Sequence, residues 1–318
     1  MNVFTAELSQ ALLRMGLFIF IGWCLARQGW VVSAARPSIM RLVIGVFFPA
    51  LIFSRVCNNP LLSSGSRSAL YLGVGFAMVV VGILVSRLVA HLLGFQTGVT
   101  KRTFAYAAGI NNFGYLGIPV TAALFNDHVM GVLLVHNVGV EAAVWTFGVA
   151  YLSGKKGWIF LKDLVQPMTI SLVIALAFNF LGWSNSAPLL FATQFTHAIG
   201  ECAIPVGTIL TGVYLFETIR GYRFFAEPRM ITGFILCRWI IIPVLLLAAA
   251  SFLIQDSELR KVMLVQAAMP AGIFSFLIVE MYKGDVSVAL RCSVFTIAFC
   301  PLITPLWLYL GSQWLHIN

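Results

Sequence analysis

The chain has 318 residues, of which 60% are hydrophobic and 10% are charged, and its mean hydropathy is +0.95. A soluble globular chain carries about 25% charged residues, so the composition excludes that class and predicts a polytopic membrane protein. We expect no large soluble domain in the chain, because its longest polar stretches are only about a dozen residues long. The formal net charge of +9 is expected from basic cytoplasmic loops, and we expect no nucleic-acid partner.

The chain begins with MNVFTAELSQALLRMGLF, which has neither a basic start nor a small-residue cleavage pattern. We therefore expect a retained first helix in the lipid bilayer rather than a signal peptide. The six cysteines lie in or beside apolar segments, and none of them forms a CxxC pair. This spacing indicates neither a disulfide framework nor a zinc site, and we expect no cofactor.

Ten apolar runs are long enough to cross a bilayer, which takes about 20 residues of helix. Only a short polar cluster, Asn126, Asp127 and His128, separates the fourth run from the fifth. The sequence therefore predicts an all-α membrane protein with ten transmembrane helices. The predicted runs are 8–26, 36–57, 69–94, 101–125, 128–153, 164–183, 187–215, 228–254, 259–282 and 286–312.

Basic residues predict the orientation of these helices. Connections after odd-numbered runs, with their flanks, hold twelve lysines and arginines, whereas those after even-numbered runs hold four. The four are Arg55, Arg67, Arg260 and Lys261. Because basic connections stay in the cytoplasm, we expect a multi-pass protein of the plasma (inner) membrane with both termini extracytoplasmic.

The hydrophilic segment SGKKGWIFLKD divides the ten runs into five and five. The sequence therefore predicts a first five-helix repeat at 1–153, a cytoplasmic linker at 154–163 and a second five-helix repeat at 164–318. An odd number of spans in each half places the halves in opposite orientations, which is the pattern of an inverted repeat.

Short matches between the halves support such a repeat. With an offset of 158 residues, NNFGYLGIPV at 111–120 lies over MPAGIFSFLI at 269–278, and Asn112 then matches Pro270. FFPALIF in the second run likewise matches AIPVGTIL in the seventh run. The agreement of these matches in order and spacing favours repetition over chance.

The fourth and ninth runs place Asn, Gly and Pro, which are poor helix formers, at membrane depth. Irregular backbone survives there only where it is buried in protein or lines a cavity. Interruptions at corresponding positions of two halves point to the binding site of a transporter. Proline kinks that only help helices to pack are the alternative interpretation.

Three motifs carry a resemblance to a known family: NNFGYLGIPV in the fourth run, AAMPAGIFSFLIVEMY at 267–282 and TPLWLYL at 304–310. With them the chain resembles the auxin efflux carrier family, which includes plant auxin exporters and bacterial permeases for small organic acids. That family is related to the bile-acid, arsenite and riboflavin transporters. The resemblance implies two inverted five-helix repeats whose broken helices 4 and 9 cross at the bilayer midplane, and transport of organic anions by alternating access.

The resemblance implies a substrate site at this crossing. A broken helix offers N–H groups at its N-terminus, which suit an anion, and the carboxamide of Asn112 adds donors for a substrate carboxylate. Capping of the broken helix ends by the asparagines is the alternative. The predicted substrate-binding residues are Asn111, Asn112, Gly114, Gly117, Pro119, Pro270, Ala271 and Gly272.

A second polar group lies in the fifth run, where VLLVHNVGVEAAVW contains His136, Asn137 and Glu141. Asn137 and Glu141 are four residues apart and share a helix face. The group is a candidate for proton or cation coupling, and a buried interhelical hydrogen-bond patch is an equal alternative. Elsewhere, we expect Glu201 and Arg238 to neutralise one another.

Motifs of intramembrane enzymes are missing, because the sequence contains neither HExxH nor GxSG; no catalytic residue is predicted. The sequence instead predicts a secondary transporter, an efflux carrier or permease for small organic anions such as carboxylic acids. A sodium-coupled organic-anion symporter of the bile-acid type and a channel stay open as alternatives, and so does assembly into a homodimer.

Overall fold

The computed structural model describes residues 2–59, 66–95, 98–114, 116–154, 167–182, 187–219 and 227–317. This part of the chain is helical, and its one element of β-structure is an isolated antiparallel bridge. Five of its helical segments are long and apolar enough to cross a membrane. The pair Val286–Ala298 and Cys300–Leu315, bent by 67°, makes a sixth when it is taken as one span. The predicted all-α membrane class is confirmed. Most of the predicted linker, 155–163, lies outside the described residues.

The first five apolar runs all contain helices. A π-helical turn, Val43–Phe47, joins α2 to α3, and a second, Val144–Gly148, joins α7 to α8. The fourth run is divided between two shorter helices, α5 and α6. The helices are α1 (Asn2–Arg27), α2 (Arg36–Leu42), α3 (Phe48–Cys57), α4 (Ser66–Leu92), α5 (Val99–Gly109), α6 (Gly117–Leu124), α7 (Asp127–Ala143) and α8 (Val149–Ser153).

The last five runs are helical in the same way. A π-helical segment, Ile235–Ile241, joins α13 to α14, and the ninth run is divided between α15 and α16. The helices are α10 (Pro167–Phe180), α11 (Ala187–Gly200), α12 (Ala203–Ile219), α13 (Pro228–Phe234), α14 (Ile242–Leu253), α15 (Ser257–Ala268), α16 (Ser275–Met281), α17 (Val286–Ala298) and α18 (Cys300–Leu315).

The helices that follow the two divided runs, α7 and α17, are each capped at the N-terminus by a side chain. The side-chain oxygen of Asn126 accepts a hydrogen bond from the N–H of Val129 at 3.1 Å, at the start of α7. A carboxylate oxygen of Asp285 accepts one from the N–H of Val288 at 3.3 Å, at the start of α17. Each cap satisfies an N–H group that the helix leaves free. The polar cluster after the fourth run is therefore a helix boundary.

Glycines let several helices touch backbone to backbone. A Cβ on Gly22 of α1 would lie 1.9 Å from the carbonyl oxygen of Ile209 in α12, and one on Gly212 would lie 1.9 Å from that of Ile19. The same holds for α4 and α7, where a Cβ on Gly139 would lie 2.0 Å from the carbonyl oxygen of Leu72. Such small-residue contacts are typical of helix packing in membranes, where dispersion forces act at short range.

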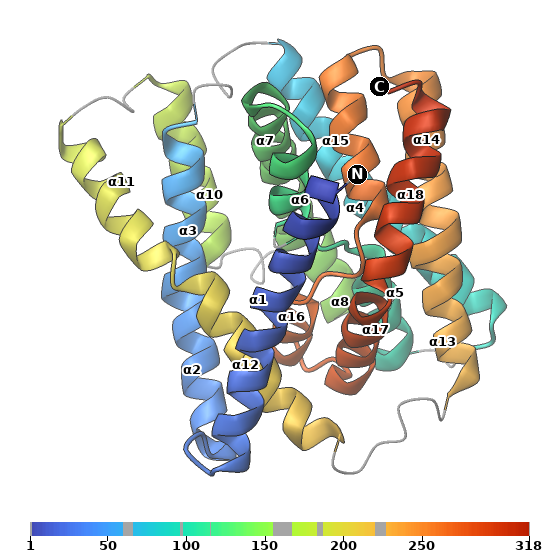
Figure 1. Cartoon of the computed structure of the whole chain (residues 1–318). Coiled ribbons are helices and arrows are strands. Elements are labelled where there is room, and N and C mark those ends of the chain that lie inside the picture. Colours follow the sequence, from blue (N-terminus) through green and yellow to red (C-terminus); the bar gives the residue numbers. More distant parts are fainter. Residues whose placement is uncertain are drawn as a thin grey trace.

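The helices form two groups, which Figure 1 shows side by side. We call α1–α3 with α10–α12 the outer group; α1 packs on α12, and α3 packs on α10 and α11. We call α4–α8 with α13–α18 the crossing group, in which α4 packs on α5 and α7, and α15 packs on α14 and α18. Both ends of the chain lie in the upper part of Figure 1.

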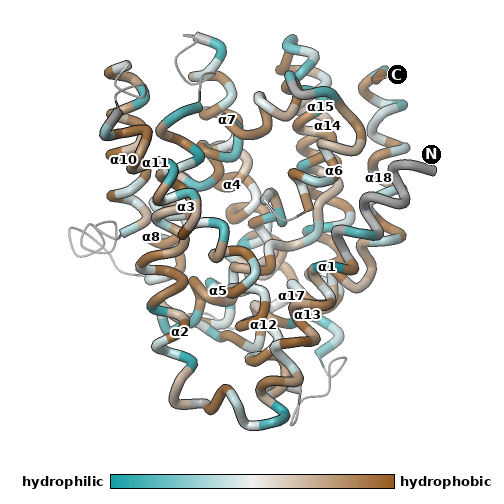
Figure 2. Tube along the Cα trace, turned by 60° about the vertical axis from the view of Figure 1, so that its left-hand side comes forward, coloured by the Kyte–Doolittle hydropathy of each residue, from teal (hydrophilic) through white to brown (hydrophobic). Residues whose placement is uncertain are grey.

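Hydropathy follows this arrangement. Figure 2 shows hydrophobic residues along the whole length of the helices, whereas many hydrophilic residues lie at helix ends and in connections. Several large apolar side chains face outward, among them Phe252 and Leu253, which are 80% and 77% exposed. An outward-facing apolar surface of this kind suits a lipid environment.

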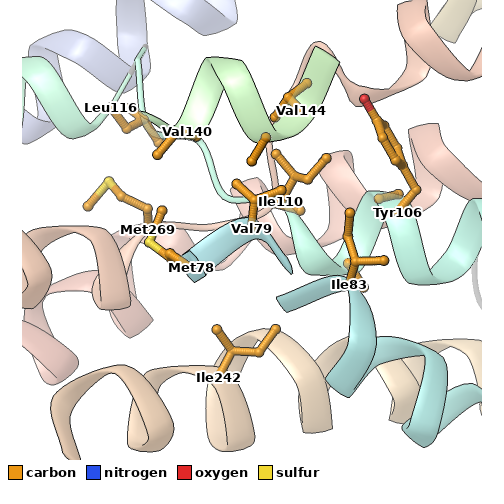
Figure 3. Close-up of a cluster of buried hydrophobic side chains, with 14 of the residues drawn as sticks. Met78, Val79, Ile83, Tyr106, Ile110, Leu116, Val140, Val144, Ile242 and Met269 are labelled. Carbon is orange, nitrogen blue, oxygen red and sulfur yellow. The ribbon is translucent and has the colours of Figure 1, made fainter. Parts of the chain in front are cut away.

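The crossing group is built on an apolar core. Figure 3 shows Met78, Val79 and Ile83 of α4 beside Ile110 and Met269, which belong to the divisions of the fourth and ninth runs. All five side chains are buried. The two divisions therefore lie deep in the protein, as irregular backbone at membrane depth requires.

Candidate functional site

Both predicted interruptions are present in the backbone. α5 ends at Gly109 and α6 begins at Gly117, whereas α15 ends at Ala268 and α16 begins at Ser275. Ile110 and Met269, the C-caps of α5 and α15, are both extended. Pro270 accounts for the second interruption, because proline lacks an N–H group and disfavours helical geometry in the residue before it.

The two extended segments pair with each other. Asn111 and Ala271 form the antiparallel bridge. The N–H of Asn112 donates to the carbonyl of Pro270 at 2.8 Å, and the N–H of Gly272 donates to the carbonyl of Ile110 at 2.9 Å. A Cβ on Gly272 would lie 3.0 Å from the carbonyl oxygen of Asn111. Each interruption thus supplies hydrogen-bond partners that the other has lost by leaving its helix.

Gln266, in the last turn of α15, connects the two interruptions to α7. The amide of Asn111 donates to the side-chain oxygen of Gln266 and, at 3.0 Å, to its backbone carbonyl. Gln266 in turn donates to the side-chain oxygen of Asn137 at 3.2 Å, and Asn137 donates to the carbonyl of Phe113 at 3.4 Å. The side chain of Gln266 is fully buried. This network fixes the positions of the first interruption, α15 and α7 relative to one another.

A cavity of about 90 Å³ lies against the paired segments. Its walls come from both groups of helices: α3 of the outer group contributes Phe48 and Leu51, and the crossing group contributes Trp145 and Phe274. The walls are mainly apolar. Its polar side chains are those of Arg55, Tyr106, Asn111, Asn112, Glu141 and Ser275.

Several polar groups at this cavity lack a hydrogen-bond partner within the described residues. The backbone N–H groups of Phe113, Gly114 and Ile273 make no hydrogen bond there. The hydroxyl of Tyr106 and the side-chain oxygen of Asn111 are buried without a partner. Buried polar groups are normally satisfied, so the cavity is suited to a polar ligand. Most of these groups are hydrogen-bond donors, and donors favour a negatively charged ligand.

Arg238 is a buried cation behind the second interruption. It is 2% exposed, its Nη2 donates to the carbonyl of Met269 at 2.6 Å, and its Nε has no partner within the described residues. The expected neutralisation of Arg238 by Glu201 is wrong. Glu201 lies in the exposed turn between α11 and α12 and faces the ring of His197 at 3.6 Å. The two side chains belong to different helix groups, which apolar periodicity along one chain does not reveal.

Comparison with known proteins decides the family. A family model described as membrane transport protein matches residues 8–158 and 156–308. An uncharacterized transporter of Methanothermobacter thermautotrophicus is 24% identical over 310 residues, which cover 94% of this chain and 97% of that protein. The chain belongs to the membrane transport protein family. This is the auxin efflux carrier family, so the resemblance is confirmed, and a relation to the bile-acid, arsenite and riboflavin transporters is consistent with it.

This membrane transport protein is a transporter and not an enzyme. Of its eight predicted substrate-binding residues, Asn111, Asn112, Gly114 and Gly272 line the cavity. The other four do not line it. Pro270 and Ala271 pair with the first interruption, and Gly117 and Pro119 belong to the first turn of α6.

The three candidates for coupling on α7 of this membrane transport protein have different surroundings. Glu141 lines the cavity, and Asn137 belongs to the Gln266 network. His136 lines a separate apolar pocket between α4, α7, α14 and α15 with Met78 and Met263, and its ring nitrogens have no hydrogen-bond partner among the described residues. The described residues contain no group of three or more His, Cys, Asp or Glu side chains that could hold a metal ion.

Sequence reasoning missed Gln266 and Tyr106. Gln266 is the one amide in the apolar stretch VMLVQAAMP, and an isolated polar residue three positions before the Met-Pro element was the available signal. Tyr106 lies three residues before the end of α5, where its hydroxyl is buried at the cavity. Figure 3 shows this hydroxyl pointing away from Ile83. Nothing in the pattern of a mainly apolar run distinguishes a tyrosine that faces a cavity from one that packs.

Proposed function

We propose that this protein is a secondary transporter for small organic anions such as carboxylic acids, and that it works by alternating access at the paired interruptions. One observation carries the proposal: two interrupted helices meet backbone to backbone beside a cavity, and residues that line this cavity have N–H groups without a hydrogen bond among the described residues. Backbone N–H donors carry no net charge. They can therefore bind an anion weakly enough for the anion to be released again.

The charges near the cavity support an anionic substrate. Arg238 lies behind the second interruption, and no carboxylate among the described residues forms an ion pair with it. Arg55 lines the cavity itself. A buried cation is costly unless an opposite charge or polar groups surround it, so an anion in the cavity is electrostatically favoured. The apolar walls suit the carbon skeleton of an organic acid.

A ten-span inverted repeat is part of the proposal. The contacts come in pairs that such a repeat relates: α1 packs on α12 as α10 packs on α3, and α17 packs on α5 as α7 packs on α15. The family model also matches the chain in two consecutive segments. We assign residues 1–153 and 164–318 to the two repeats. The distribution of basic residues supports extracytoplasmic termini in the plasma (inner) membrane.

Reconstitution into liposomes tests the function. Uptake of labelled organic acids is measured under imposed sodium, proton and voltage gradients. Saturable uptake with exchange of unlabelled for labelled acid supports the carrier. An ohmic anion current supports a channel, and a strict requirement for sodium supports the sodium-coupled symporter. Failure of every organic anion to be transported would contradict the proposed substrate class.

Asn112→Ala tests the site. The backbone N–H of Asn112 still pairs with Pro270 in this variant, so we expect a folded protein. Loss of the carboxamide removes a donor from the cavity, and loss of a hydrogen bond to a charged group weakens binding by about 1.5–3 kcal/mol. The KM for the acid is expected to rise at least about tenfold. Asn58→Ala, at the exposed end of α3, is the matched control. Equal KM values in the two variants would refute the assignment.

A further inference from the structure

The cavity is lined by two oppositely charged side chains, and they stand on different helix groups. Arg55 is on α3 of the outer group, and Glu141 is on α7 of the crossing group. Among the described residues that line the cavity, these are the only two with a formal charge. Any charged substrate in the cavity therefore meets both of them.

Neither charged group has a direct partner in the part of the chain that the structure describes. Within the described residues, Arg55 makes no hydrogen bond and no ion pair, and its nitrogens lie more than 4.0 Å from the carboxylate of Glu141. All five N–H donors of the guanidinium are consequently available. Arg55 and Glu141 still attract each other across the cavity. Attraction without contact leaves room for a ligand between the two groups.

Among the described residues, no other charged group lies beside Glu141. Tyr106 is the further titratable side chain in the cavity, and His136 faces the separate apolar pocket. α6 and α10 carry no charged residue in their helical spans. The remaining titratable and charged groups on α4 and α15 are engaged elsewhere: Arg67 and Tyr71 near Asp256, Arg87 at Tyr151, His91 at Lys101, Lys261 at Glu258, and Arg260 at the carbonyl of Ile254.

We propose that the carboxylate of the substrate binds to Arg55, and that Glu141 takes up one proton from the aqueous solution on the same side of the membrane, so that anion and proton cross the membrane together. The proposal rests on the proposed transport of organic anions. Two carboxylates that share a confined site do not both stay ionised. The substrate carboxylate binds the guanidinium of Arg55 in a bidentate geometry and stays ionised. Glu141 is therefore the carboxylate that is protonated.

Charge balance explains why Arg55 and Glu141 belong to different helix groups. In the empty carrier, the positive Arg55 and the negative Glu141 compensate one another. In the loaded carrier, the anion compensates Arg55 and the proton neutralises Glu141. The cavity charge from these groups is zero in both states, so the outer and crossing groups can move past each other without dragging a net charge through a low-dielectric region. An anion without its proton lacks this balance.

Proteoliposomes with a trapped pH indicator test the coupling. Lactate, pyruvate and mandelate, which each carry one negative charge, are the labelled probes, and both acid uptake and proton movement are recorded. In the natural protein we expect protons to accompany the acid and an inward proton gradient to accelerate uptake. In Glu141→Gln we expect exchange of labelled for unlabelled acid to continue, whereas acid-linked proton movement and gradient-driven uptake are lost. Glu201→Gln, an exposed carboxylate outside the cavity, is the matched control.

Arg55 variants test the anion site. For Arg55→Gln we expect the KM for the acid to rise about 10- to 100-fold, because a charge-assisted hydrogen bond is lost, and for Arg55→Lys a smaller rise. Arg14→Gln, which removes an exposed arginine on α1, is the control. If Arg55→Gln does not fold, the proposal is tested instead by the KM of Arg55→Lys and by the proton measurement on Glu141→Gln.

The outcomes separate this inference from the proposed function. Acid uptake without proton movement in the natural protein, or an unchanged KM in the Arg55 variants, would overturn the inference and leave anion transport standing. Absence of uptake of all three acids, with a folded protein, would remove the proposed function itself.

Discussion

At the scale of residues, the polar side chains near the interruptions have two kinds of surroundings. Gln266 is enclosed by protein partners, and Arg238 donates to the carbonyl of Met269 from behind the second interruption. Arg55, Tyr106 and Glu141 line the cavity and keep unused hydrogen-bonding capacity. Enclosed groups hold a backbone in place, because each bond they lose leaves a buried group unsatisfied. Groups with spare capacity are the ones available to a substrate.

Gln266→Leu is expected to destabilise the protein. The variant leaves the amide of Asn111 with one acceptor fewer and removes the donor to Asn137, and each buried polar group left unsatisfied costs about 1–3 kcal/mol. Thermal unfolding of the detergent-solubilised protein should therefore begin at a lower temperature. Gln313→Leu, on an exposed position of α18, is the matched control. Equal melting temperatures would show that the network does not support the fold.

At the scale of elements, the helices that follow the two interruptions are too short to be stable by themselves. α6 has 8 residues and α16 has 7, whereas isolated helices need about 12–15 residues in water. Their geometry is maintained by packing: α6 lies on α1 and α7, and α16 lies on α17 and α5. The interruptions are therefore a property of the tertiary structure as much as of their Asn, Gly and Pro residues.

Gly212→Ala tests the close packing of α1 on α12. Its Cβ would lie 1.9 Å from the carbonyl oxygen of Ile19, which is backbone and can give way only if the helices separate. Overpacking of this kind costs about 1–3 kcal/mol or more, and we expect a lower melting temperature. Gly16→Ala on α1 is the control, because a Cβ there meets no atom within 4 Å. A Gly212 variant as stable as this control would contradict the close contact between the two backbones.

At the scale of the molecule, the cavity lies where the outer and crossing groups meet. The rings of Phe48 in the outer group and Phe274 beside the second interruption make an edge-to-face contact with centroids 4.8 Å apart. Phe274 also contacts α12, since a Cβ on Gly207 would lie 2.3 Å from its ring. Alternating access requires contacts of this kind to be broken and remade.

A cross-link between the groups is expected to stop transport. In a background without the native cysteines, Phe48→Cys with Phe274→Cys is treated with a short thiol cross-linker, and acid uptake by proteoliposomes is measured before and after cleavage of the link. Phe104→Cys with Phe234→Cys is the control, because these rings stack at 5.2 Å within the crossing group and need not separate. Full uptake by the cross-linked Phe48 and Phe274 pair would argue against relative motion of the two groups.

The positions of the helices and of both interruptions could be predicted from the sequence. Apolar runs show where helices lie because a membrane helix must be apolar over its whole length, and Asn111, Asn112 and Pro270 stand out against that background. The surroundings of individual polar residues could not be predicted in this way. The sequence predicts a pair of Arg238 with Glu201 and places His136 beside Glu141 on one helix, whereas the structure gives these residues different neighbours.

The amino-acid sequence was sufficient to establish an all-α membrane protein with two interrupted helices and a family resemblance that the comparison confirmed. The folded structure was needed to show that the interruptions pair through Asn111 and Ala271, that Gln266 ties them to α7, and that Arg55 and Glu141 line one cavity. This difference arises because hydropathy depends on the solvent around each segment and can be followed along the chain. Contacts between segments far apart in the sequence depend on how the helices pack, which no local pattern specifies.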